Sequence, residues 1–204
     1  MSLQKWIFKF EKQKEEIERQ LLPGESMIHC IDTESFGGRF YNPRWVATSE
    51  SRVYSLPRKR WLKGTAKLCK NKAGDVTRVN WTVTNTENEK DITVHQLTAN
   101  YFCNKTVVEQ FGEENVHVHH IWGYNPEKSC QENNRAECLQ YIVKKHHTFL
   151  NNLQRGTYRI PENVDQDVRT TYNTIKHLYP RGRASVRLLY DADGTMTFNT
   201  TLRL

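Results

Sequence analysis

No stretch of this sequence approaches the roughly eighteen consecutive apolar residues that a membrane-spanning helix needs. The first residues also lack the apolar core and small-residue cleavage site of a secretory signal peptide. The five cysteines are an odd number and include no C-x-x-C pair, which argues against a disulfide framework and for a reducing compartment. We therefore expect an intracellular, cytoplasmic protein with no membrane partner.

Acidic residues are missing from residues 52–72, although the chain of 204 residues holds 23 of them against 30 Lys and Arg. Most of the net charge of +7 can be accounted for by this segment, which also contains Tyr54 and Trp61. Cations interleaved with aromatic residues are typical of contact with a phosphate backbone, whereas a solvated loop that aids solubility is the alternative. The cations of the segment are Arg52, Arg58, Lys59, Arg60, Lys63, Lys67, Lys70 and Lys72.

The hydrophobic pattern predicts a mixed chain of helices and short strands. Apolar residues at helical spacing predict an amphipathic helix over residues 3–21, which Pro23 and Gly24 end. A loop is expected over residues 34–44. Strands are expected at 45–47, 52–56, 77–84, 91–94 and 116–121, with helices within 97–102 and over 137–153. The last third predicts a helix over 161–179 and a hairpin that turns at Asp193-Gly194.

Five of the eight histidines lie between residues 117 and 147. In a strand, His117 and His119 point to one face and His120 to the other. In a helix, His146 and His147 diverge by about 100°. This arrangement suggests a divalent ion held between a strand histidine and a helix histidine, with a further histidine deprotonating water. Ordinary surface or core histidines are the alternative.

Several segments together resemble the H-N-H endonucleases of the homing and phage type, the His-Me finger or ββα-metal family. The core resemblance lies in VHVHHIWG at residues 116–123 and NNRAECLQYI at residues 133–142. Upstream, SRVYSL at 51–56 resembles the start of the DNA-binding module that precedes this core, and VHQLTANYF at 94–102 resembles a further family segment. The matches occur in the family's order and cover roughly residues 42–153.

The resemblance implies an α+β fold, with a ββα-metal finger flanked by small antiparallel sheets and by N- and C-terminal helices. It implies that His120 is the general base and that His119 and His147 are the metal ligands. It further implies that Asn134 and Cys138 stabilise the loop of the motif. The DNA-binding residues would be Arg52, Arg58, Lys59, Arg60, Lys63 and Arg135.

The sequence departs from the family pattern in the middle of the motif. The gap between His120 and Asn133 is longer by about six residues, a size of insertion that surface loops tolerate. Cys138 stands where the family has an asparagine that bonds to backbone groups of the loop. Because a thiol bonds weakly, the tie would be weakened or carried instead by Asn133 or Asn134.

The resemblance implies one divalent ion, Mg2+ or Mn2+, while an all-histidine ligand set leaves room for Zn2+ or Ni2+. It implies a metal-dependent hydrolase of phosphodiester bonds in double-stranded DNA. A non-catalytic DNA-binding protein on the same scaffold is one alternative. A structural zinc domain that uses Cys130 or Cys138 with His147 is another.

We expect four segments: an N-terminal helix and loop at 1–41, a basic β-rich DNA-positioning module at 42–105, the H-N-H core at 106–156, and a helix with a hairpin at 157–204. The N-terminal helix and the C-terminal hairpin could each serve as the surface of a homodimer or pack into the core.

Overall fold

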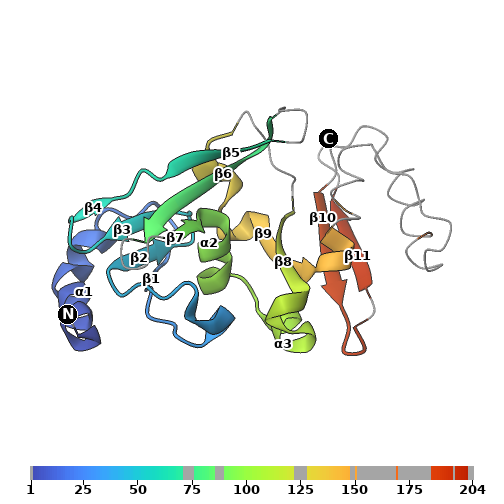
Figure 1. Ribbon diagram of the computed structural model, residues 1–204, viewed down its shortest axis with the longest axis horizontal. Helices are drawn as coiled ribbons and strands as arrows, with labels where there is room; N and C mark the ends of the chain where they lie inside the picture. Colours follow the sequence, from blue (N-terminus) through green and yellow to red (C-terminus); the bar gives the residue numbers. More distant parts are fainter. Residues whose placement is uncertain are drawn as a thin grey trace. The chain divides into compact units, whose positions relative to one another are not determined.

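The computed structural model describes residues 2–70, 76–85, 90–121, 128–147, 150, 169, 185–194 and 196–201 (Figure 1). In these residues the protein combines helices with antiparallel sheets, so the α+β class is confirmed. The chain forms two compact units, one of Met1–Asn104 with Glu127–Leu139 and the other of Lys105–Pro126 with Gln140–Leu204. No helix in the described ranges is long and apolar enough to cross a membrane.

The first unit contains a four-stranded antiparallel sheet in the order β1-β2-β3-β4. The predicted strands at 45–47 and 52–56 are confirmed as β2 (Trp45–Thr48) and β3 (Val53–Ser55). Their edge partners, β1 (Met27–His29) and β4 (Arg60–Trp61), were not predicted, because two or three residues are too short for a periodic pattern.

The helix α1 (Leu3–Glu18) lies along this sheet and ends three residues before the predicted position (Figure 1). Trp6 and Ile17 of α1 form one core cluster with Val46 and two further sheet residues, Tyr54 and Leu56. The neighbours of Val46 in β2, Trp45 and Ala47, belong to a second core cluster. The alternation of a strand therefore gives β2 two buried faces.

A three-stranded antiparallel sheet and a helix complete the second cluster. The sheet consists of β5 (Thr65–Lys70), β6 (Val76–Asn85) and β7 (Lys90–Thr93), followed directly by α2 (Val94–Phe102). These elements contribute buried side chains to the same core cluster as Trp45 and Ala47, namely Val83, Ile92 and Leu97. The predicted strands at 77–84 and 91–94 and the predicted helix within 97–102 are confirmed, apart from Val94, which starts α2.

The predicted loop at 34–44 contains a short helical turn, η1 (Ser35–Gly38). The return segment of the first unit contains α4 (Cys130–Asn133) and η3 (Ala136–Cys138). Ser129 and Glu132 form a capping box at the start of α4, in which the side chain of each accepts a hydrogen bond from the backbone N–H of the other.

The second unit begins with α3 (Thr106–Phe111) and η2 (Glu113–Asn115) and continues into β8 (Val116–His120). This confirms the strand predicted at 116–121. β8 pairs with β9 (Leu139–Val143), and the chain is helical at residues 144–147. The helix predicted over 137–153 was therefore wrong at 139–143, where the alternating apolar side chains and β-branched Ile142 and Val143 favour a strand.

The predicted C-terminal hairpin is confirmed as β10 (Ser185–Tyr190) and β11 (Met196–Thr201), which pair antiparallel from Ser185 opposite Thr201 to Tyr190 opposite Met196. In its turn, Gly194 has φ of 79° and donates its N–H to Asp191 O at 3.0 Å. The helix predicted over 161–179 lies outside the described residues, except for Arg169, which is helical.

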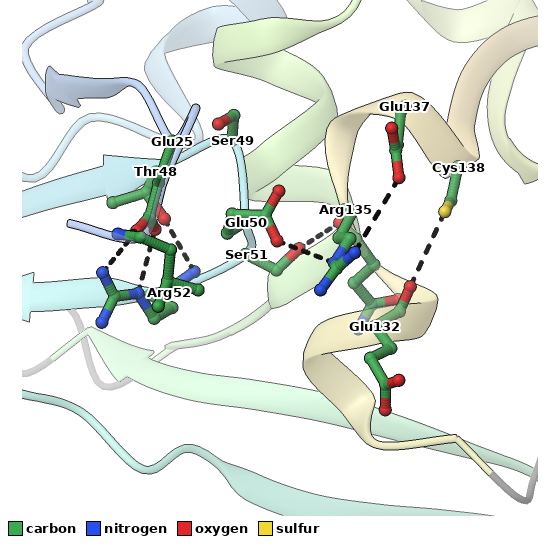
Figure 2. A network of polar contacts seen from close by, with 12 residues as sticks. Glu25, Thr48, Ser49, Glu50, Ser51, Arg52, Glu132, Arg135, Glu137 and Cys138 are labelled. Atoms are coloured by element: carbon green, nitrogen blue, oxygen red, sulfur yellow. Dashed lines mark hydrogen bonds and ion pairs between the residues drawn. The ribbon is translucent and has the colours of Figure 1, made fainter.

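An ion pair within the first unit yields a pH-dependent prediction. Arg52 Nε donates to Glu25 Oε1 at 2.9 Å, the Arg52 guanidinium also contacts Oε2, and Leu22 N–H donates to Oε2 at 2.7 Å (Figure 2). Burial alone would raise the pKa of Glu25, but these hydrogen bonds hold that pKa below its ordinary value of 4.5. The stabilisation is therefore fully present above pH 4.5 and is lost as the pH falls through the lower pKa of the folded state.

Glu25→Gln should lower the free energy of unfolding near neutral pH by about 3 kcal/mol, because it leaves the largely buried Arg52 without its counter-charge. It should also flatten the dependence of stability on acid pH, measured by urea unfolding at several pH values. Glu16→Gln is the matched control, because Glu16 pairs with Arg19 in solvent and should change stability by less than about 1 kcal/mol. Equal effects of the two variants would contradict the prediction.

Candidate functional site

The histidines of β8 lie on opposite faces of the strand. His117 is exposed and His119 is buried, and both contact the ring of His147, so they share one face. His120 is half-buried and follows the alternation to the other face. The pairing of His117 with His119, and the separation of His120 from both, agree with the spacing in the sequence.

His147 lies in the helical turn that follows β9, and its ring faces β8. His147 Nδ1 is 3.1 Å from His117 Nδ1, with ring centroids 5.2 Å apart and the rings nearly perpendicular at 88°. The His119 ring centroid is 5.6 Å from that of His147 at 77°. The two predicted ligands, His119 and His147, therefore lie side by side, and His147 is also hydrogen-bonded to His117.

The spacing of the two ring nitrogens can be tested against the requirement of a metal ion. An ion that binds imidazole nitrogens at about 2.1 Å holds neighbouring ligands about 3.0–3.4 Å apart in tetrahedral or octahedral geometry. The 3.1 Å contact between His117 Nδ1 and His147 Nδ1 is a hydrogen bond between the two rings, and its length also falls in the range for two ligands of one ion. Among the described residues, no group of three His, Cys, Asp or Glu side chains is placed to hold an ion.

His117 was not among the predicted ligands, although the sequence contained a signal for it. A strand places residues i and i+2 on the same face, so any partner of His119 from a neighbouring element can also reach His117. Both His117 and His119 lie against the ring of His147.

His146 lies on the other side of the same helical turn and is buried. Its Nδ1 is 3.0 Å from Tyr190 Oη, and the two rings stack with centroids 5.7 Å apart at 25°. Burial, with a smaller contribution from Lys145, lowers the pKa of His146 to about 4. His146 is therefore a neutral core histidine near neutral pH, whereas His147 faces the other histidines, as the angle between successive helical residues requires.

The predicted loop-stabilising residues lie in the first unit. Cys138 Sγ donates to Glu132 O at 3.6 Å, a weak interaction (Figure 2). Asn133 Nδ2 donates to Lys128 O at 3.3 Å and to Ser129 O at 3.0 Å. Asn134 is buried, and its amide contacts Cys130 Sγ at 3.1 Å. At the start of α4, the carbonyls of Lys128 and Ser129 therefore accept hydrogen bonds from the side chain of Asn133.

Arg135 is held between two carboxylates of the first unit. Its Nε is 2.7 Å from Glu50 Oε2, and its guanidinium is 4.0 Å from Glu137 Oε1 (Figure 2). The backbone beside it is also held, because Ala136 N–H donates to Ser49 O at 2.8 Å. The turn between β2 and β3 therefore anchors this segment, and the charge of Arg135 is already neutralised within the chain.

The basic segment divides into two kinds of cation. Arg52 packs its guanidinium over Trp61 at 4.0 Å, pairs with Glu25 and donates to Gln20 O at 2.8 Å, so its guanidinium has partners within the first unit. The other predicted DNA-binding cations of the segment are exposed and form no ion pair within the described part of the chain. These exposed cations are Arg58, Lys59, Arg60 and Lys63, which we call the basic cluster.

Comparison with known proteins finds no matching family model and no matching curated protein. A solved structure similar to this chain is that of the HNH homing endonuclease I-HmuI, described for its binding and cleavage of DNA. The two are 17% identical, with a TM-score of 0.40, over 85% of this chain and 77% of that chain. Similarity at this level does not establish a shared family.

Proposed function

We propose that this protein is a metal-dependent DNA endonuclease of the H-N-H type. The observation that carries the proposal is the 3.1 Å contact between His117 Nδ1 and His147 Nδ1, in which His117 lies on the same strand as His120, three residues before it. His117 lies in the first segment that resembles the H-N-H motif, residues 116–123, and His147 follows the second, residues 133–142, by five residues.

Each histidine has a distinct role in the proposed reaction. His147 and His117 would hold the ion, with His119 packed against the ring of His147. When bound, the ion would neutralise charge on the scissile phosphate and on the departing oxygen. His120, which the resemblance matches to the family's general base, would accept the proton of the attacking water.

Two imidazoles together with oxygen ligands are compatible with several divalent ions. Mg2+ and Mn2+ prefer oxygen ligands, which water and phosphate would provide beside the two imidazoles. Zn2+ and Ni2+ accept imidazole nitrogens more readily. We therefore propose one divalent ion. Cleavage rates measured with each of the four ions identify the most active one.

The basic cluster would position double-stranded DNA. Its exposed cations have no competing carboxylate among the described residues, unlike Arg52 and Arg135. Phosphate contacts of this kind contribute affinity without sequence preference. We assign Arg52 and Arg135 to the fold of the first unit.

A non-catalytic DNA-binding protein is the second candidate, favoured by the weak contact of Cys138 and by the absence of a three-ligand group in the described ranges. A structural zinc site that uses Cys130 or Cys138 with His147 is the third candidate.

The deciding experiment is a cleavage assay on supercoiled and linear plasmid DNA with Mg2+, Mn2+, Zn2+ or Ni2+ at several salt concentrations. We expect cleavage with at least one ion and none with excess chelator. DNA binding without cleavage under every ion would reject the endonuclease and support the binding protein. Unfolding by chelator, together with stoichiometric bound zinc, would support the structural zinc site.

A further inference from the structure

The C-terminal hairpin contacts the helical turn that carries His147. Tyr190, the last residue of β10, accepts a hydrogen bond from Val143 N–H at 3.1 Å, and its hydroxyl is 3.0 Å from His146 Nδ1. Because its oxygen accepts from Val143, the hydroxyl hydrogen is available to His146 Nδ1. One side chain therefore joins the end of β9 to the first turn after it.

The ring of Tyr190 is also confined on two sides. It stacks on the His146 imidazole, and it meets Phe111 of α3 edge-on with centroids 5.4 Å apart at 64°. The two contacts limit both translation of the ring and rotation about its Cβ–Cγ bond. Packing thus holds the ring, while the hydroxyl is held by its own contacts with Val143 and His146.

The strand that carries Tyr190 is anchored at two further points. Gln140 Nε2 donates to Leu188 O at 3.0 Å, while Leu188 N–H donates to Gln140 Oε1 at 3.1 Å. Gln110 Nε2 donates to Asp191 O at 2.9 Å and to Ala192 O at 3.0 Å. These bonds come from β9 and α3, so β10 and its turn are fixed relative to the elements around the histidines.

We propose that Tyr190 is a positioning residue that sets His147 against His117. Val143 directly precedes the helical residues 144–147, and N–H groups at the start of a helix have no acceptor within the helix. The Tyr190 hydroxyl provides the acceptor for Val143 N–H. Because the Tyr190 hydroxyl contacts both Val143 and His146, it fixes which side of the helical turn at residues 144–147 faces the hairpin. His147, the next residue, is then directed to the other side, about 100° away, where it meets β8. The functional importance of this pair rests on the proposed metal site.

The test compares the wild-type protein with Tyr190→Phe, which keeps the ring and removes the hydroxyl. The readouts are the affinity for Mn2+ and Ni2+ by titration calorimetry, and the nuclear Overhauser effect between the imidazoles of His117 and His147 in the absence of metal. We expect metal affinity to fall by about tenfold, as for other groups that orient a ligand from behind. The inter-ring signal should weaken, and circular dichroism should show an intact fold.

Phe111→Leu is the control, because it loosens the packing of the Tyr190 ring and retains the hydroxyl. It should lower the melting temperature but leave metal affinity and the inter-ring signal near those of the wild type. Unchanged affinity and signal in Tyr190→Phe would overturn the proposal, as would equal losses in both variants. If the wild-type protein binds no ion but Tyr190→Phe still loses the inter-ring signal, the positioning role stands and the proposed function fails.

Discussion

His120→Ala should slow DNA cleavage by about 10²–10⁴-fold, the range for loss of a general base. The substitution removes the imidazole proposed to take the proton of the attacking water. It leaves the two nitrogens 3.1 Å apart on the other face of β8 untouched. Metal affinity and DNA affinity should therefore stay close to those of the wild type. Single-turnover cleavage of plasmid DNA, calorimetric titration with the most active ion, and DNA binding with chelator measure the three quantities separately.

Val118→Ala is the matched control for His120→Ala. Val118 is half-buried in β8 and shares the face of His120 by the alternation of the strand. Its truncation should change stability slightly and leave the cleavage rate within a few-fold of the wild type. If His120→Ala cleaves at the wild-type rate, another group deprotonates the water, and the role given to His120 is wrong.

Replacing the basic cluster by alanine should weaken DNA binding by an amount that depends strongly on salt. If each of Arg58, Lys59, Arg60 and Lys63 neutralises one phosphate, the slope of log K against log salt should become less steep by about 3–4. At 0.1 M salt, the same relation corresponds to a loss of affinity on the order of 10³-fold. Fluorescence anisotropy with labelled duplex DNA over a range of salt concentrations measures both.

The control for the basic cluster removes the same net charge from a different surface. The exposed lysines of α1 and Arg19, the residue at its C-terminal end, lie among acidic residues, so their removal should change the salt slope by less than about one. This control carries Lys5→Ala, Lys12→Ala, Lys14→Ala and Arg19→Ala. Equal losses in the two quadruple variants would show that binding responds to net charge alone and that the basic cluster is no DNA site.

Local periodicity predicted most of the described secondary structure. The alternation in residues 116–121 predicted β8, and the spacing around Leu97 predicted α2. The prediction failed at β9, because residues 139–143 follow a short helical turn and precede a helical one, so a pattern read across all three looked helical. Strands such as β4, with two residues, exist only because a neighbouring strand supplies their hydrogen bonds.

The charge pattern of the sequence also failed to distinguish a buried cation from the exposed ones. Arg52 stands in an acid-free run and resembled the other cations, but its carboxylate partner, Glu25, lies 27 positions away in the chain. Folding buries this pair beneath Trp61 and leaves the basic cluster in solvent. A count of charges along the sequence cannot separate the two cases, since desolvation and pairing depend on neighbours in space.

The sequence by itself determined the residue types and their faces. It placed the strand histidines on two sides of β8, separated His146 from His147, and concentrated positive charge in residues 52–72, because these properties depend only on local backbone geometry. Only the tertiary structure decided that His117 Nδ1 is hydrogen-bonded to His147 Nδ1, that Arg52 pairs with Glu25, and that Tyr190 joins the hairpin to the helical turn. Those choices depend on how separate elements pack, which no local pattern encodes.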